Sequence, residues 1–179
     1  GPDAGPVREY FVQNAAYWID EYHLDGLRLD AIQGIHDRSP EHLVATISTG
    51  ARQAGGDRRI IIVGENERQE SFNMYPTTEG GYGVDAAWND DFHHSAYVVL
   101  TGRNEAYFSD HRGAPQEFIS AAKWGYLYQG QRYKWQRGRR GTPALDLPPE
   151  AFVNFTENHD QVANTAHGHR LHQMTSPGR

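Results

Sequence analysis

The sequence predicts an α/β fold, a partial (β/α)8 TIM barrel with a parallel sheet, and two observations support this prediction. Stretches with helical periodicity alternate with short apolar runs, a pattern typical of strands joined by crossover helices. Three apolar runs end on a carboxylate: GLRLDA reaches Asp30, IIIVGEN reaches Glu65 and FVNFTENHDQ reaches Asp160. The carboxyl ends of barrel strands form one rim, where the active site of such a barrel is built.

The composition excludes several classes of protein. The chain has 179 residues, enough for one domain, and 37% of them are hydrophobic, which is enough for a core. The lack of cysteine excludes a disulfide framework and fits a reducing compartment. No apolar stretch approaches the ~18–20 residues of a membrane span, and the net charge of −6 disfavours a polyanionic partner. We therefore expect a cytoplasmic protein with no membrane or nucleic-acid partner.

The first third of the chain predicts a helix followed by a strand. Gly5-Pro6 begins the helix, since proline fits the first helical turn. Apolar residues follow at helical spacing, namely Val7, Phe11, Trp18 and Tyr22, with Tyr10 and Ala15 beside them. After Asp25-Gly26 the period changes to two, which places Leu27, Leu29 and Ala31 on one face of a strand. Arg28 and Asp30 share the opposite face.

The middle of the chain predicts a second helix and a second strand. Ser39-Pro40-Glu41 has the order of cap, proline and acid that begins a helix, and Gly55-Gly56 ends it. The continuous run from Ile60 to Val63 is typical of a strand that is covered on both faces.

The second half of the chain predicts two further strands. Residues 84–88 form a weaker strand candidate, Pro115 begins a helix, 128–149 are irregular and 151–156 form the last strand. Four strands are about half of an eight-stranded barrel, which needs ~250 residues.

The three carboxylates could perform acid–base and nucleophilic chemistry. The neighbouring guanidinium of Arg28 would keep Asp30 ionised, as a nucleophile must be. The apolar run before Glu65 and the nearby carboxylates would both raise its proton affinity, as a general acid requires. Asp160 could bind substrate hydroxyls or oppose positive charge in a transition state. The alternative is a structural salt bridge between Arg28 and Asp30, with two solvated loop acids.

These segments resemble the alpha-amylase family of retaining glycoside hydrolases and transglycosidases. GLRLDA is similar to the segment that carries the nucleophile, IIVGEN to that of the acid/base, and ENHDQ to that of the third acid. The resemblance implies Asp30 as nucleophile with Arg28 as its partner, and Glu65 as proton donor. It implies Asp160 as transition-state stabiliser and His159 as a ligand of a substrate hydroxyl.

Within the family, YWIDEYHLDGLRLDAIQGIHD, WNDDFHH and FTENHDQVAN are most similar to enzymes that release trehalose. The implied substrate is a maltooligosaccharide or maltooligosyltrehalose, and no cofactor is implied. Branching enzymes share several of these pieces and stay an alternative, as does a non-catalytic glucan-binding relative. We expect residues 1–179 to be a fragment of one catalytic barrel, strands four to seven, without the first strands, the last strand and the C-terminal β domain.

Other polar clusters allow more than one interpretation. WNDDFHH predicts a substrate-side loop, and we include Gln161 with it as a substrate ligand; the four loop residues are Asp90, Asp91, His93 and His94. Their spacing fits no closed zinc pattern, so we expect no metal. The basic stretch QRYKWQRGRRG could be a lid with Trp135 or Tyr133 stacked on a sugar, a solvated loop or, less favoured, a nucleic-acid contact.

Overall fold

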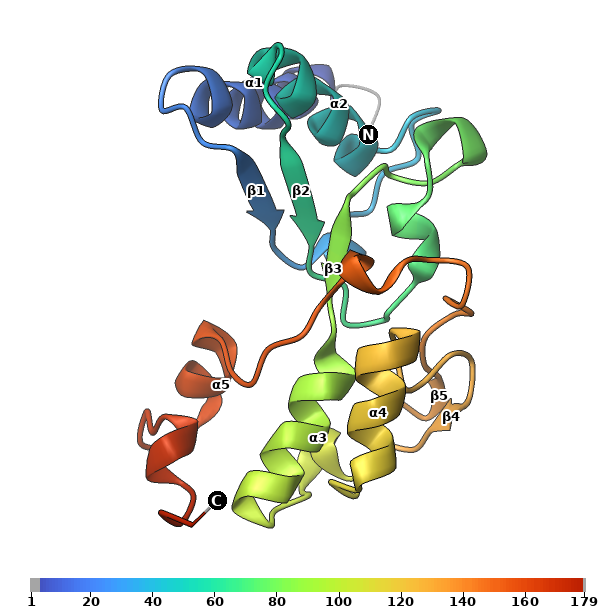
Figure 1. The fold of residues 1–179 in the computed structure, drawn as a ribbon. Coiled ribbons are helices and arrows are strands. Elements are labelled where there is room, and N and C mark those ends of the chain that lie inside the picture. Colours follow the sequence, from blue (N-terminus) through green and yellow to red (C-terminus); the bar gives the residue numbers. More distant parts are fainter. Residues whose placement is uncertain (1–3, 179) are drawn as a thin grey trace. The chain divides into compact units, whose positions relative to one another are not determined.

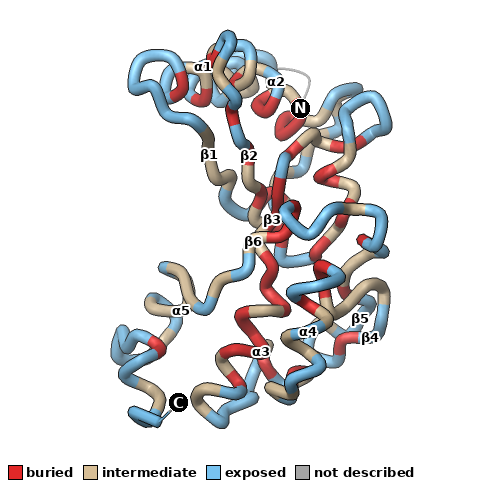
Figure 2. The backbone as a smooth tube through the Cα atoms, viewed as in Figure 1, coloured by how far each residue is buried: buried red, intermediate tan, exposed pale blue. Residues whose placement is uncertain are grey.

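The computed structural model describes residues 4–178 of the chain and divides into two compact units. The first unit ends at Ala87 and the second begins at Trp88. Each has its own helices and its own buried residues (Figures 1 and 2). Among the described residues, no helix combines the length and the apolar character that a membrane crossing needs.

The first unit contains two helices and most of a parallel sheet. Its elements are α1 (Gly5–Asp20), β1 (Gly26–Leu29), α2 (Leu43–Gly55) and β2 (Ile61–Gly64), and β3 (Ala86–Trp88) runs across the unit boundary. Short 3-10 turns cover Ile32–Gly34, Ser71–Met74 and Thr77–Glu79. β1 pairs with β2 and β2 pairs with β3, both in parallel. The predicted alternation of helix and strand is confirmed, and each parallel pair is joined by the crossover that it needs.

α1 packs on α2 through small and aliphatic side chains. Ala15 and Ile19 of α1 are 5% and 0% exposed. A Cβ added at Gly50 of α2 would lie only 2.8 Å from Val12 Cγ1. The two helices therefore approach closely at Gly50, and this approach requires small contact residues.

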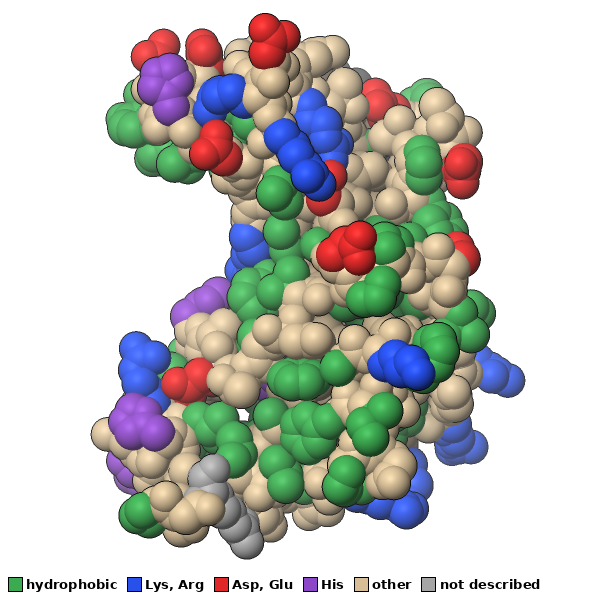
Figure 3. All heavy atoms as spheres, in the orientation of Figure 1, with side chains coloured by type: hydrophobic (Ala, Val, Ile, Leu, Met, Phe, Trp, Pro, Cys, Tyr) green, Lys and Arg blue, Asp and Glu red, His purple; other side chains and the backbone are tan. Residues whose placement is uncertain are grey.

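The helix predicted from this spacing is confirmed, but the aromatic stripe of α1 does not face this core. Phe11, Trp18 and Tyr22 are 46%, 40% and 55% exposed. Figure 3 shows hydrophobic side chains on the outer surface at the α1 end of the first unit. The helix has two apolar faces, and the close approach to α2 selects the face with the smaller residues.

α2 begins later than the sequence predicts. Its first residue is Leu43, and Ser39 lies outside the helix. The Asp37 carboxylate accepts hydrogen bonds from the backbone N–H groups of Ser39 and Leu43, at 3.0 and 2.8 Å. Asp37 thus satisfies an N–H group at the helix start that would otherwise lack a partner. A hydrogen bond with the Ser39 side chain, these two backbone hydrogen bonds and the nearby Arg8 guanidinium lower the pKa of Asp37.

β2 is covered on one face in the first unit. Ile60 and Ile62 are 4% and 0% exposed, whereas Ile61 between them is 43% exposed. Successive strand residues point to opposite faces, so the prediction of a strand covered on both sides was wrong for this unit.

A Gly26→Ala substitution should destabilise the β1–β2 pair. A Cβ at this position would lie 2.2 Å from the carbonyl oxygen of Ile61, which is backbone and cannot move aside cheaply. We expect a loss of about 1–3 kcal/mol in the free energy of unfolding, measured by urea denaturation of the full-length protein. Gly34→Ala is the matched control because a Cβ there meets nothing within 4 Å. Equal losses in both variants would contradict this close packing.

The second unit is mainly helical. Its elements are α3 (Asp90–Thr101), α4 (Pro115–Trp124), β4 (Arg132–Tyr133), β5 (Gly138–Arg139), β6 (Phe152–Val153) and α5 (His159–Asn164). Further 3-10 turns cover Ala106–Phe108, Pro149–Ala151 and Leu171–Gln173. β4 and β5 form an antiparallel hairpin within the stretch predicted to be irregular. The strand order in the larger sheet is β1-β2-β3-β6, and this α/β arrangement agrees with the predicted partial barrel.

The segment predicted as a substrate-side loop is helix α3. The Asn89 side chain accepts a hydrogen bond from Phe92 N at 3.3 Å and caps the helix. Its amide group donates to Ala121 O, Gly125 O and Asn154 Oδ1, all within 3.1 Å. Asn89 therefore joins the start of α3 to the end of α4 and to the chain that follows β6.

The last strand is also shorter than predicted. β6 contains only Phe152 and Val153. Asp160 lies in the first turn of α5 rather than directly at a strand end.

Candidate active site

Arg28 brings two of the predicted carboxylates together at the end of the β1–β2 pair. The parallel register pairs Leu29 with Gly64, so the next residues of the two strands, Asp30 and Glu65, leave the sheet side by side. The Arg28 guanidinium donates through one nitrogen to Asp30 Oδ1, and its other terminal nitrogen lies 3.0 Å from Glu65 Oε1. The sequence predicted the first contact but not the second.

Backbone hydrogen bonds fix the position of Glu65. Its N–H donates to Leu29 O at 2.9 Å, its carbonyl accepts from Ile32 N at 2.9 Å, and its Oε2 accepts from Ala31 N at 2.8 Å. Ala31 adopts a φ of 45°, in the left-handed region that side chains disfavour. The prediction that Ala31 continues the strand face of Leu29 was therefore wrong. The chain turns at Ala31, and its N–H is directed at the Glu65 carboxylate.

The surroundings of Glu65 raise its pKa. Burial is the main cause, because it disfavours the charged carboxylate. The Ala31 N–H and the Arg28 guanidinium act in the opposite direction, while the nearby carboxylate of Asp30 raises the pKa further. Glu65 can therefore hold a proton at a higher pH than an ordinary glutamate.

Asp30 has a different environment. Its side chain is 66% exposed, against 17% for Glu65, and it contacts the Arg28 cation. The site thus combines two carboxyl groups with different properties. Asp30 is accessible and lies beside a cation, whereas Glu65 is shielded and keeps its proton to a higher pH. Such a difference between neighbouring carboxyl groups allows one to act as nucleophile and the other as acid.

In the second unit, the structure places His159, Asp160 and Gln161 in the first turn of α5. Asn158 Oδ1 accepts from Asp160 N at 2.8 Å, and Gln161 Oε1 accepts from Asn158 N at 2.8 Å. His159 Nε2 lies 3.5 Å from Asp160 Oδ1, and the two side chains are 67% and 43% exposed. This reciprocal cap holds Asp160 in a fixed turn with an accessible carboxylate.

The four predicted loop residues on α3 are buried rather than exposed to a ligand: Asp90, Asp91, His93 and His94 are each at most 9% exposed. Asp91 accepts from Arg140 Nε at 3.0 Å and from Tyr128 N at 2.8 Å. Their assignment as substrate ligands stays a prediction, and the contacts observed here hold the unit together.

A buried histidine pair lies beside Asp91. His94 Nδ1 is 3.2 Å from His111 Nε2, and the other ring nitrogen of His111 is 3.2 Å from Ser95 Oγ. Burial is the main cause that lowers the pKa of both histidines, which favours neutral rings. Asp91, His94 and His111 offer ligand atoms within 4.8 Å of one another. However, Asp91 already forms an ion pair with Arg140, and the positive charge of Arg140 would repel a metal ion at this point.

His93 connects α3 to the turn that carries Asp160. Since Gln161 Oε1 accepts from Asn158 N, the amide NH2 group of Gln161 faces His93 Nε2, at 3.5 Å. Only a neutral His93 ring can accept a hydrogen bond from this NH2 group. Burial lowers the pKa of His93 to about 3, which keeps the ring neutral near neutral pH.

Arg140 is the most important residue of the second unit that the sequence did not indicate. It is 1% exposed and lies over the Tyr133 ring at 4.9 Å. Tyr133 itself is 0% exposed, so the prediction that it could stack on a sugar was wrong. Trp135 on the same hairpin is 53% exposed, and its role in a lid stays a prediction. A basic cluster in the sequence does not reveal which arginine will face a buried acid.

Comparison with known proteins gives a consistent result, although no family model matches the chain. It is 36% identical over 171 residues to a malto-oligosyltrehalose trehalohydrolase of Saccharolobus solfataricus, covering 94% of this chain and 30% of that protein. A trehalohydrolase of Mycobacterium tuberculosis is 32% identical, covering 100% of this chain and 31% of that protein. The chain thus spans about three tenths of the length of these curated relatives.

Two further relatives have other names. A 1,4-alpha-glucan branching enzyme of Francisella philomiragia is 30% identical over 101 residues, covering 46% of this chain and 16% of that enzyme. A crystal structure from Salmonella typhimurium, described as an alpha amylase, has a TM-score of 0.86 and 39% identity, covering 97% of this chain and 30% of that one. The likeness in sequence and in fold shows that the chain belongs to the alpha-amylase family, as part of its barrel.

Proposed function

We propose that the full-length protein is a retaining glycoside hydrolase that cleaves the α-1,4-glucosidic bond next to the terminal trehalose of maltooligosyltrehalose. The observation that carries this proposal is the pair formed by Asp30 and Glu65, one accessible and one shielded, on a shared Arg28. The names of the relatives that match nearly the whole chain support the choice of substrate.

The first step forms a covalent intermediate. The Asp30 carboxylate attacks the anomeric carbon of the glucose unit, the bond to the leaving oxygen breaks, and Glu65 gives that oxygen its proton. Trehalose leaves with the proton, and the maltooligosaccharide stays esterified to Asp30.

The second step releases the sugar. Glu65, now ionised, removes a proton from water while the water oxygen attacks the same anomeric carbon. The ester bond breaks, and Asp30 is free as a carboxylate. Arg28 assists because its cation stabilises Asp30 both as attacking and as leaving group.

The turn of α5 supplies the remaining predicted roles. Asp160 opposes the positive charge that develops on the sugar ring, and His159 binds a sugar hydroxyl beside it. Gln161 is placed in the same turn, as the third predicted ligand there. The accessible carboxylate and the fixed cap of this turn support these roles.

Product analysis tests the reaction. The full-length protein should release free trehalose from maltooligosyltrehalose and a maltooligosaccharide shorter by that unit. A branching enzyme, the alternative supported by the Francisella relative, would instead form α-1,6 branches in amylose. Binding of glucan without either product would contradict both assignments and favour a non-catalytic relative.

Replacing Arg28 with methionine should shift the alkaline limb of the pH–rate profile to higher pH. The Arg28 cation lowers the pKa of Glu65, so its removal favours the protonated carboxyl group that the first step needs. We also expect a lower kcat, because Asp30 loses its partner. The measurement is kcat/KM for trehalose release against pH, with Arg59→Met as a control at an exposed position. An alkaline limb that moves to lower pH would contradict this electrostatic assignment.

A further inference from the structure

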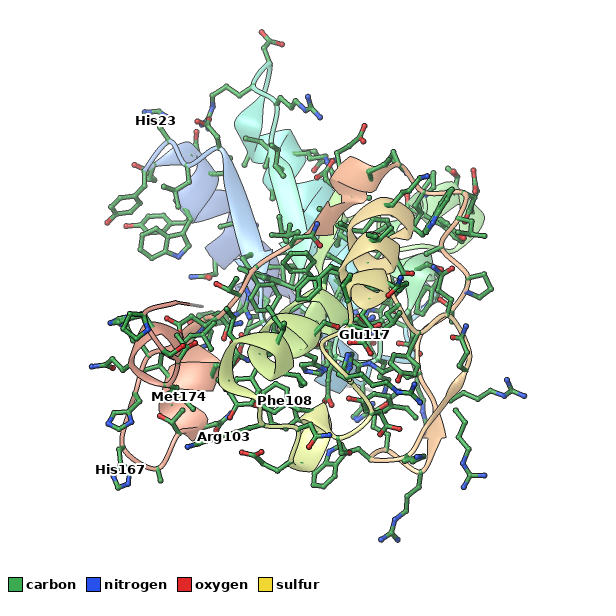
Figure 4. The ribbon with its side chains drawn as sticks, turned by 60° about the horizontal axis from the view of Figure 1, so that its bottom comes forward. His23, Arg103, Phe108, Glu117, His167 and Met174 are labelled. Atoms are coloured by element: carbon green, nitrogen blue, oxygen red, sulfur yellow. The ribbon has the colours of Figure 1, made fainter. Side chains whose placement is uncertain are left out.

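The second unit contains a pocket of about 510 Å³, and Gln161 is the one predicted substrate ligand in its lining. One side comes from the connection between α3 and α4, and the other from the segment that follows β6. Figure 4 shows Arg103 and Phe108 on the first of these segments, and His167 and Met174 on the second. The volume is within the range of about 300–1,000 Å³ that small-molecule sites occupy.

One wall of the pocket is aromatic. The rings of Tyr97 and Phe108 stack with centroids 3.9 Å apart and an interplanar angle of 11°. The Tyr107 ring lies 4.2 Å from that of Phe108 and also lines the pocket. Such a wall offers a flat apolar surface to a ligand.

The lining from α5 and from Thr165, which follows the helix, is polar and uncharged. Gln161, Asn164 and Thr165 contribute amide and hydroxyl groups to the pocket. The acid Glu157, which also lines it, accepts from Leu171 N at 2.7 Å and pairs with Arg170 at 3.7 Å. Arg103 and Glu105 also line the pocket, and their charges are opposite. The pocket therefore lacks a strong excess of one charge, which favours a neutral ligand with many hydroxyl groups over a phosphorylated one.

The backbone that carries the aromatic wall is strained. Ala106 has a φ of 54°, which a residue with a Cβ rarely adopts. This turn is held by hydrogen bonds from Phe108 N to Glu105 O at 3.1 Å and from Ser109 N to Ala106 O at 3.0 Å. Strain of this kind is common where a ligand is held, and here it places two rings on the pocket wall.

The pocket is next to the turn that carries Asp160. Gln161 lines the pocket and follows Asp160 in the chain. Its side chain is fixed by Asn158 on one side and His93 on the other. A glucan with one glucose unit at Asp160 would thus have the pocket directly beside it.

We propose that this pocket binds one or two glucose units of an α-1,4-glucan chain, adjacent to the unit at Asp160, with Tyr107 as an apolar platform. The proposal rests on the proposed function, because it assumes an α-glucan substrate. The pocket then determines how kcat/KM depends on the length of the substrate. The amide and hydroxyl groups of α5 then bind sugar hydroxyls while a ring faces the C–H groups of the sugar.

The test uses Tyr107→Ala in the full-length protein, with two readouts. The first is kcat/KM for a series of maltooligosyltrehaloses of increasing length. We expect the variant to lose about tenfold or more on long substrates and less than about twofold on the shortest one that wild type cleaves. Tyr107→Phe should behave like wild type, because it keeps the ring. Trp124→Ala is the matched control, since it removes an exposed ring outside the pocket.

The second readout is calorimetric binding of maltoheptaose, which does not depend on trehalose release. Tyr107→Ala should weaken this binding about fivefold or more, and Asn164→Ala should weaken it in the same direction. A wild type that binds maltoheptaose through Tyr107 without releasing trehalose would support the pocket and contradict the proposed reaction. Unchanged binding and unchanged length dependence in Tyr107→Ala would overturn the pocket assignment, as would an equal loss on substrates of every length.

Discussion

Replacing Asp30 with asparagine in the full-length protein should lower kcat at least about a thousandfold, because an amide cannot form the glucosyl ester. The fold should not change, since the side chain is 66% exposed and its ion-pair partner is Arg28. Asp57→Asn, at another exposed acid in the same unit, is the control. The measurement is the rate of trehalose release, with unfolding followed in parallel.

Chemical rescue makes this prediction sharper. In Asp30→Ala, azide can occupy the space of the lost carboxylate and attack the same face of the sugar. Because the attack is opposite to the leaving group, the product should be a β-glycosyl azide of the maltooligosaccharide. Near-normal activity of Asp30→Asn would show that another group is the nucleophile.

Replacing Arg140 with methionine should cost about 3–5 kcal/mol in the free energy of unfolding, the usual cost of leaving a buried charge without its partner. Arg140 lies 3.0 Å from Asp91 Oδ1 and 3.8 Å from Asp90 Oδ2, and it is 1% exposed. Arg139→Met, at the exposed neighbouring position, should cost less than about 1 kcal/mol. Urea denaturation of the full-length protein measures both values.

A double-mutant cycle identifies the cause of this loss. If the uncompensated Asp91 carboxylate is responsible, adding Asp91→Asn to Arg140→Met should cost less than the sum of the two single losses. Strictly additive losses, or equal stability of the Arg139 and Arg140 variants, would contradict a buried ion pair as the main contribution of Arg140.

The proximity of Asp30 and Glu65 could be predicted from the sequence because the signal is local. Asp30 and Glu65 each follow a short apolar run, and parallel pairing of two such strands brings their carboxyl ends together. The raised pKa of Glu65 was also predicted from burial and a nearby acid, and the same causes act in the structure. The turn at Ala31 was not predicted, because an alanine gives no signal for a positive φ.

The interior of the second unit could not be predicted in the same way. Arg140 and Asp91 are separated by 49 positions in the chain, and no periodicity connects them. The start of helix α3 does have a local signal in the sequence, since Asn89 is a favourable cap and two acids follow it in the first turn. The polarity of Asp91, His93 and His94 suggested an exposed loop, whereas mutual hydrogen bonds and ion pairs allow these groups to be buried.

A crystal structure of full-length Glu65→Gln with bound maltooligosyltrehalose tests the central claim most directly. The variant should bind the substrate without cleaving it, because it cannot donate the proton. We predict that the carboxylates of Asp30 and Asp160 both contact one glucose unit, with Asp30 Oδ facing its anomeric carbon. The carboxyl positions of residues 30 and 65 should be about 5–5.5 Å apart, as a retaining mechanism requires. A substrate bound elsewhere, or Asp30 and Asp160 on different sugar units, would contradict the account.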